Sequence, residues 1–210
     1  MKISKSIFGV CISAIVLAGF MVWAPTSVDA QEVTLKLHNF LSPKAIGNRL
    51  FMKPWAKKLE KESNGRIKVQ VFPSMQLGGK PKDLIPQARD GVVDLAWSLP
   101  GYTSGQFPLT AVFELPFVGG TSSAVSPAVM EYYGKYLQEE YSAVKVIVLH
   151  STDVGLVHAK KPINKLEDLK GIKFRAASRW VGESIKALGG IPVGMPLPRL
   201  AEALSRNQVN

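Results

Sequence analysis

The sequence predicts an α/β protein built around a parallel sheet. Residues 33–38 and 66–72 alternate apolar and polar side chains, which is the pattern of a half-buried strand. Between them, residues 45–62 carry apolar side chains at helical spacing, with one apolar stripe. A second helix and a third strand follow along the chain. The order strand, helix, strand, helix, strand predicts strands that run parallel in one sheet.

The other elements follow from the same periodicities and from turn residues. Pro54 lies inside the first helix and should kink it or shift its start. We expect a short helix over residues 82–90, a buried strand over 91–97 and a longer helix over 122–140. Two further strands are expected over residues 144–150 and 155–159. Residues 98–116 are rich in proline and glycine, so we expect a loop that covers another part of the molecule.

Residues 163–176 are the stretch around which the chain is organised. Two leucines flanked by charges indicate a short helical turn, which Gly171 ends by taking the left-handed conformation. Residues 172–175 alternate and predict a strand with Arg175 at its rim, before a helix that Ser178 caps. An arginine there offers a planar fork to an anion beside a helix N-terminus. On spacing alone, Arg175 could equally be a surface arginine at a strand end.

The N-terminus has the features of a secretory signal peptide. Lys2 and Lys5 precede an apolar run over residues 7–23, and small residues ending at Ala30 mark the expected cleavage site. An uncleaved membrane anchor is the alternative. The single cysteine, Cys11, lies within this segment, so we expect a mature protein without disulfides.

The composition is that of a globular protein with a basic surface. Hydrophobic residues make up 46% of the chain and charged residues 20%, which excludes a disordered chain. A formal net charge of +10 raises the local concentration of anionic ligands. The basic residues are scattered rather than gathered on one helix with aromatics, and this distribution, together with export, argues against nucleic acid as a partner.

Motifs of catalysis and metal binding are missing from the sequence. His38, His150 and His158 have no ligand-like spacing, and there is no cysteine pair. Ser104, between Gly101 and Gly105, lies one place off the Gly-x-Ser-x-Gly elbow, and no predicted strand runs into it. We therefore expect a protein that is not an enzyme and has no cofactor and no metal. A secreted hydrolase that uses Ser104 remains an alternative.

Two stretches resemble the solute-binding subunits of tripartite ATP-independent periplasmic (TRAP) transporters of the DctP-like family. One is INKLEDLKGIKFR followed by ALGGIPVGMPLPRLAEALSRNQVN, and the other is WAKKLEKESNGRIKVQVFPSMQLGG followed by ARDGVVDLAW. The resemblance implies a two-lobe periplasmic-binding-protein (Venus-flytrap) fold that captures an organic acid, a periplasmic location and a membrane permease as partner. Family members continue beyond this point, so we expect an incomplete second lobe. The expected signal peptide, first lobe and partial second lobe span residues 1–30, 31–152 and 153–210 respectively.

The resemblance also implies a binding site. In that family the arginine at the position of Arg175 pairs with the ligand's carboxylate. Ligands of open α/β sheets lie beyond the carboxyl ends of the strands, so residues after the first and third strands should face the second lobe across a cleft. The expected substrate-binding residues are Arg175, Trp97, Ser98, Leu99, Tyr102, His38, Asn39, Trp180, Met195 and Leu197. One arginine with apolar walls suits a monocarboxylate with an aromatic or hydrophobic body.

Other interpretations of these residues remain open. Trp97 could be a core residue, Asn39 a turn former and His38 a satisfied polar residue. Arg179 either assists Arg175 or lies exposed at the start of a helix. The position of a second arginine in sialic-acid-binding members falls at about Gly155 here, which disfavours a sugar acid. A ligand-sensing protein that serves a membrane sensor would share all of these features.

Overall fold

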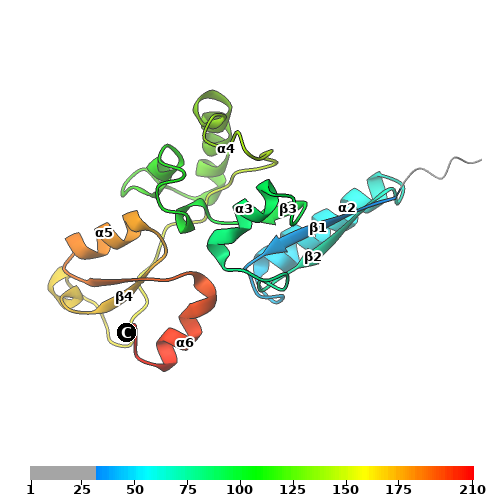
Figure 1. The fold of residues 1–210 in the computed structure, drawn as a ribbon. Coiled ribbons are helices and arrows are strands. Elements are labelled where there is room, and N and C mark those ends of the chain that lie inside the picture. Colours follow the sequence, from blue (N-terminus) through cyan, green and yellow to red (C-terminus); the bar gives the residue numbers. More distant parts are fainter. Residues whose placement is uncertain (1–31) are drawn as a thin grey trace, which may run out of the picture. The chain divides into compact units, whose positions relative to one another are not determined.

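A three-stranded parallel sheet forms the first part of the chain. The structure is a computed structural model that describes residues 32–210, so the expected signal peptide lies outside the described residues (Figure 1). The central strand β1 (Val33–Asn39) pairs in parallel with β2 (Ile67–Phe72) on one side and with β3 (Leu95–Trp97) on the other. The predicted parallel sheet is confirmed.

Helices connect these strands. The π-helical turn η1 (Gly47–Met52) and the helix α2 (Lys53–Glu62) join β1 to β2, and α2 packs against β2. Pro54 lies in the first turn of α2, which follows directly on the π-helical turn. Met52 and Lys53 both have helical φ and ψ, so the helical backbone runs unbroken from η1 into α2, and the predicted shift of its start at Pro54 is wrong. The 3₁₀ turn η2 (Pro81–Asp83) and the helix α3 (Leu84–Arg89) join β2 to β3.

The strand β3 is shorter than the predicted strand over residues 91–97. Gly91 has a φ of 72°, and the N–H of Val92 donates to the carbonyl of Gln87 at 2.9 Å. These contacts close a turn at the end of α3, so the chain becomes extended only at Leu95. Apolar character alone does not distinguish a turn from a buried strand.

Residues 98–141 form a region of short helices. Its elements are η3 (Pro100–Tyr102), η4 (Thr110–Glu114), α4 (Ser122–Tyr132) and η5 (Tyr133–Leu137). Phe107, Leu137 and Tyr141 form a buried cluster there, and the ring centroids of Phe107 and Tyr141 lie 4.7 Å apart. Burial raises the pKa of Tyr141 to about 12, because the phenolate would lose its hydration.

The strands predicted over residues 144–150 and 155–159 are wrong. No strand among residues 32–210 pairs with either segment. The backbone N–H groups of Leu149 and Ser151 donate instead to side chains, the Met130 sulfur at 3.0 Å and the Ser126 hydroxyl at 3.1 Å. An alternating pattern shows which face could be buried, but a strand also needs a neighbour whose backbone groups are free.

A second, separate sheet holds two parallel strands. The elements in this part are η6 (Leu166–Leu169), β4 (Lys173–Ala176), α5 (Arg179–Ala187), β5 (Ile191–Gly194), η7 (Leu197–Arg199) and α6 (Leu200–Ser205). Gly171 has a φ of 77° and ends the turn before β4, and Ser178 caps α5 by accepting a hydrogen bond from the N–H of Val181 at 3.4 Å. Both predictions are confirmed. In the described part of the chain, no helix has the length and apolar character needed to span a membrane.

Candidate functional site

The carboxyl ends of the two sheets meet through one tyrosine. Register pairs Asn39 with Trp97 at the ends of β1 and β3, and Arg175 with Val193 near the ends of β4 and β5. Tyr102, on η3 just after β3, reaches across so that its hydroxyl lies 3.2 Å from Nη2 of Arg175. The edges at which α/β folds bind ligands are therefore joined at this contact.

The guanidinium of Arg175 is oriented by two hydrogen bonds. Its Nε donates to the carbonyl of Met195 at 3.0 Å, and its Nη2 donates to the hydroxyl of Tyr102. A guanidinium carries five N–H donors. The hydrogens of Nη1 and one hydrogen of Nη2 have no partner among residues 32–210, and no carboxylate there pairs with this arginine. Arg175 is thus fixed in direction and can still bind an anion.

Tyr102 links the two sheets through its hydroxyl oxygen. This oxygen accepts one hydrogen bond from Arg175 and a second from the backbone N–H of Leu197 at 3.0 Å. The two donors come from β4 and from the start of η7, whereas Tyr102 belongs to the loop after β3. The three predicted site residues Arg175, Tyr102 and Leu197 therefore lie together.

Aromatic rings continue from Tyr102 away from the arginine. The ring of Tyr102 lies 5.1 Å from that of Phe40, and Phe40 lies 5.3 Å from Trp97. Trp97 stacks on His150 at 5.8 Å with an interplanar angle of 23°, and its indole N–H donates to Nε2 of His150 at 3.1 Å. We call the set His150, Trp97, Phe40 and Tyr102 the aromatic row. It ends beside the Arg175 guanidinium.

Sequence reasoning missed two members of the aromatic row. Phe40 follows the last residue of β1 directly, so its position beyond a carboxyl end was a usable indication. His150 closes a segment that was predicted to be a strand, and only its contact with Trp97 places it near the site. No spacing rule in the sequence connects residues 97 and 150.

The polar side chains of His38 and Asn39 find their hydrogen-bond partners within the protein. Both side chains are completely buried. Nδ1 of His38 lies 2.8 Å from Oε1 of Gln87, and Nε2 accepts from the N–H of Leu77 at 3.3 Å. The amide of Asn39 exchanges hydrogen bonds with that of Asn48, at 3.0 and 3.3 Å. These contacts fit the structural roles considered above, and a ligand-binding role for either residue stays a prediction.

The remaining predicted residues fall into two groups. Met195 is buried, and its backbone carbonyl accepts a hydrogen bond from Nε of Arg175. Ser98 and Leu99 are half-buried in the segment that leads into η3, and the Ser98 hydroxyl lies 3.5 Å from the carbonyl of Pro81. Trp180, on α5, is 37% exposed and lines a separate pocket. The structure therefore brings Met195 to Arg175 and leaves Trp180 beside a neighbouring cavity.

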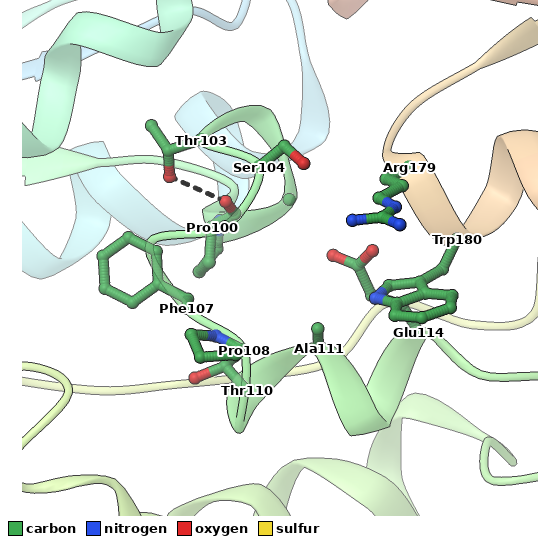
Figure 2. A pocket seen from close by; sticks show the side chains of 12 residues that line it. Pro100, Thr103, Ser104, Phe107, Pro108, Thr110, Ala111, Glu114, Arg179 and Trp180 are labelled. Atoms are coloured by element: carbon green, nitrogen blue, oxygen red, sulfur yellow. Dashed lines mark hydrogen bonds between the residues drawn. The ribbon is translucent and has the colours of Figure 1, made fainter.

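The neighbouring pocket lies between the loop after β3 and the start of α5 (Figure 2). It has a volume of about 120 Å³, and its wall is mostly apolar, with Phe107 and Ala111 among its residues. Arg179 and Glu114 project into one side, and the Arg179 guanidinium carbon lies 5.5 Å from the centroid of Trp180 (Figure 2). In residues 32–210, no three His, Cys, Asp or Glu side chains gather as potential ligands for a metal ion.

Gly101 allows the loop that carries Tyr102 to approach α5. A Cβ at this position would lie 2.3 Å from Oε1 of Glu114 and 2.9 Å from the Cβ of Ser178. Contacts this short do not occur between real side chains, so any larger residue would push the loop away from the start of α5. The absence of a side chain at residue 101 therefore helps to bring Tyr102 within reach of Arg175.

Comparison with known proteins assigns the family. Residues 42–210 match the model of the family described as bacterial extracellular solute-binding protein, family 7. Among curated proteins, the outer membrane transporter protein TsaT of Comamonas testosteroni is 30% identical over 203 residues, which are 95% of this chain and 58% of that protein. The chain thus spans less than two thirds of this relative's length.

Solved structures of TRAP solute-binding proteins share the fold. One from Rhodoferax ferrireducens T118, in complex with copurified benzoate, is 42% identical with a TM-score of 0.79 over 85% of this chain and 56% of that one. A protein from a marine metagenome, specific for aromatic acids and co-crystallised with 3-hydroxybenzoate, is 41% identical with a TM-score of 0.80 over 86% and 57%. The expected periplasmic-binding-protein fold is confirmed. The chain belongs to family 7 of the bacterial extracellular solute-binding proteins, the DctP-like binding proteins of TRAP transporters.

Proposed function

We propose that this protein captures an aromatic monocarboxylate in the periplasm and presents it to the membrane permease of a TRAP transporter. The observation that carries the proposal is the aromatic row, which ends at an arginine without an acidic partner among the described residues. The half-buried rings of Trp97 and Tyr102 offer apolar surface to a ligand's ring, with the buried Phe40 packed against both, and the arginine offers a fork to the carboxylate.

The energetics favour a ligand with both parts. Charge-assisted hydrogen bonds to a carboxylate are roughly twice as strong as neutral ones, and favourable aromatic pairs add about 0.5–1.5 kcal/mol beyond the area they bury. Arg175 needs no reorientation to bind, because Met195 and Tyr102 already hold it. Preorganisation of this kind reduces the entropy lost on binding.

The relatives' ligands agree with this chemistry. Benzoate and 3-hydroxybenzoate each join a single ring to a single carboxylate, and the proteins that hold them are 42% and 41% identical to this chain. The matching family and these neighbours are described as solute-binding proteins. We therefore propose capture without catalysis, in which closure is selected because the ligand contacts both lobes.

A sensory role and a hydrolase are the alternatives. A binding protein that serves a membrane sensor would need the same site, and only the identity of its membrane partner separates the two roles. The hydrolase has weaker support, because the hydrogen bonds of His38 and His150 go to Gln87, Leu77 and Trp97. Neither imidazole hydrogen-bonds to Ser104, as a base that activates a nucleophile would, and Ser104 lies at the pocket of Figure 2.

A thermal-shift screen of the purified protein against aromatic, keto and dicarboxylic acids tests the proposal. A ligand that binds only the native state raises the melting temperature by mass action. We expect a shift with benzoate or 3-hydroxybenzoate that exceeds the shift with dicarboxylates. A shift with dicarboxylates alone, or with no acid at all, would contradict the proposed ligand class.

Replacement of Arg175 tests the site. Arg175→Ala should weaken benzoate binding by about 2–5 kcal/mol, because the carboxylate would be desolvated without its charge partner. Arg175→Lys should recover only part of this loss, since an ammonium lacks the planar fork. The exposed Arg49 on η1 provides the control, and Arg49→Ala should bind like the unmodified protein. Equal affinities in all three variants would remove Arg175 from the site.

A further inference from the structure

We infer that Tyr102 is a second carboxylate-binding residue, which donates its phenolic proton to the ligand that Arg175 holds. The inference rests on the proposed function, because it concerns the same site. It assigns to Tyr102 a direct contact with the ligand in addition to its link between the two sheets.

The hydrogen-bond inventory of the phenol points to this role. A tyrosine hydroxyl can accept two hydrogen bonds and donate one. Nη2 of Arg175 and the N–H of Leu197 donate to this oxygen at 3.2 and 3.0 Å, which uses its capacity to accept. Its own proton has no acceptor among residues 32–210. The phenol is therefore free to donate its proton to a group outside the described protein, such as a bound ligand.

The position of the hydroxyl is fixed from several sides. The N–H of Leu197 belongs to the backbone at the start of η7, so it cannot rotate to another acceptor. The ring packs 5.1 Å from that of the buried Phe40, and Gly101 allows the close approach of the loop to α5. A donor held in this way loses little entropy when it binds a ligand.

The ligand chemistry follows from the two groups together. The unused N–H donors of Arg175 belong to the same guanidinium whose Nη2 bonds to the Tyr102 hydroxyl. A positive charge and a neutral donor therefore lie next to each other. An ionised carboxylate fits such a pair, because its two oxygens provide about four acceptor positions and it carries no proton to clash with the donors. The site therefore selects the ionised acid over its amide or ester.

Tyr102→Phe tests the inference with benzoate as the probe. The phenylalanine keeps the ring beside Phe40 and removes only the hydroxyl. Isothermal titration should show a loss of affinity of roughly ten- to a hundredfold, the effect of one hydrogen bond to a charged group. Tyr136 is 59% exposed on η5 and supplies the control, since Tyr136→Phe should leave the affinity unchanged. Equal affinity in Tyr102→Phe would overturn the inference.

A fluorinated tyrosine at position 102 separates donation from a purely structural role. Fluorine beside the hydroxyl makes the phenol a stronger donor and a weaker acceptor. At a pH where the phenol stays protonated, we expect tighter benzoate binding if Tyr102 donates to the ligand. If Tyr102 serves only to accept from Arg175, the affinity should fall or stay the same, and either result would overturn the inference.

The two proposals can fail separately. If the unmodified protein binds benzoate and Arg175→Ala does not, while Tyr102→Phe binds normally, only the role of Tyr102 is overturned. If the unmodified protein binds neither benzoate nor 3-hydroxybenzoate, both proposals are overturned. The affinity of benzamide provides a further check, because an ionised acid should bind at least tenfold better than its neutral amide if charge and donor act together.

Discussion

The buried amide pair of Asn39 and Asn48 holds together the end of β1 and the turn that follows it. The side-chain Oδ1 of Asn39 accepts from the N–H of Leu41 at 2.9 Å and from the Asn48 side chain at 3.3 Å. The Asn48 amide also donates to the carbonyls of Leu41 and Ser42, at 3.2 and 2.8 Å. Phe40 lies within this turn, so the pair positions one ring of the aromatic row.

Replacement of Asn39 should therefore reduce stability. Asn39→Ala removes the acceptor of the Leu41 N–H and the donor to the buried side-chain oxygen of Asn48, which should cost about 1–3 kcal/mol of unfolding free energy. Urea denaturation measures the change. The exposed Asn164 is the control, and Asn164→Ala should change stability by less than about 0.5 kcal/mol. Full stability of Asn39→Ala combined with loss of benzoate binding would instead place Asn39 in the ligand site.

Single residues were predictable where their role is local. The position of Arg175 follows from the alternation of its own strand, and the cap at Ser178 from the residue type before a helix. The contact of Trp97 with His150 joins residues far apart in the sequence, and the internal hydrogen bonds of His38 depend on Gln87 and Leu77. Such partners are chosen by packing, which no local pattern contains.

At the scale of elements, the turn at Gly171 sets the direction of β4. Its φ of 77° lies in the left-handed region, and no heavy atom would lie within 4 Å of a Cβ there. The cost of a side chain at this position is therefore conformational and not steric.

Alanine substitutions isolate this cost. Gly171→Ala should destabilise the protein by about 1–2 kcal/mol, because the left-handed conformation brings the Cβ of an L-residue too close to the backbone carbonyl. Gly134, in η5, likewise has open space where a Cβ would lie but has a negative φ, so Gly134→Ala should be neutral or stabilising by up to about 1 kcal/mol. The melting temperatures of the two variants should move apart. Equal changes would contradict a conformational origin.

Elements were predictable to the extent that their own residues determine them. The parallel strands β1 and β2 follow from alternation, and the helical segment between them follows from the helical spacing of its apolar residues. The segments over residues 144–150 and 155–159 have the composition of strands and find no strand partner in the described chain. Strand formation depends on a neighbour, so composition alone could not exclude it.

At the scale of the whole molecule, one loop decides how the site is assembled. Gly101 and Tyr102 lie between the two sheets in sequence, and Tyr102 contacts residues at the carboxyl ends of the second. The periodicities predicted the first sheet and the strand that carries Arg175, and the resemblance implied the role of that arginine. Neither predicted that a tyrosine hydroxyl would join them, because this contact depends on the close approach that Gly101 permits.

The lobe boundaries, the ligand and the membrane partner stay predictions. The structure contains two separate sheets, as a two-lobed binding protein should. A ligand held between Arg175 and the aromatic row would contact residues from both, so it would bind the closed arrangement better than an open one. The basic surface, with a net charge of +10, would in addition favour the arrival of anions.

A crystal structure of the protein with bound benzoate tests the central claim most directly. We predict that the carboxylate accepts hydrogen bonds from the free N–H groups of Arg175 and from the hydroxyl of Tyr102, with its ring against the aromatic row. The contrary result would place the carboxylate at Arg179, in the pocket of Figure 2, with Arg175 bonded only to Met195 and Tyr102 as it is here.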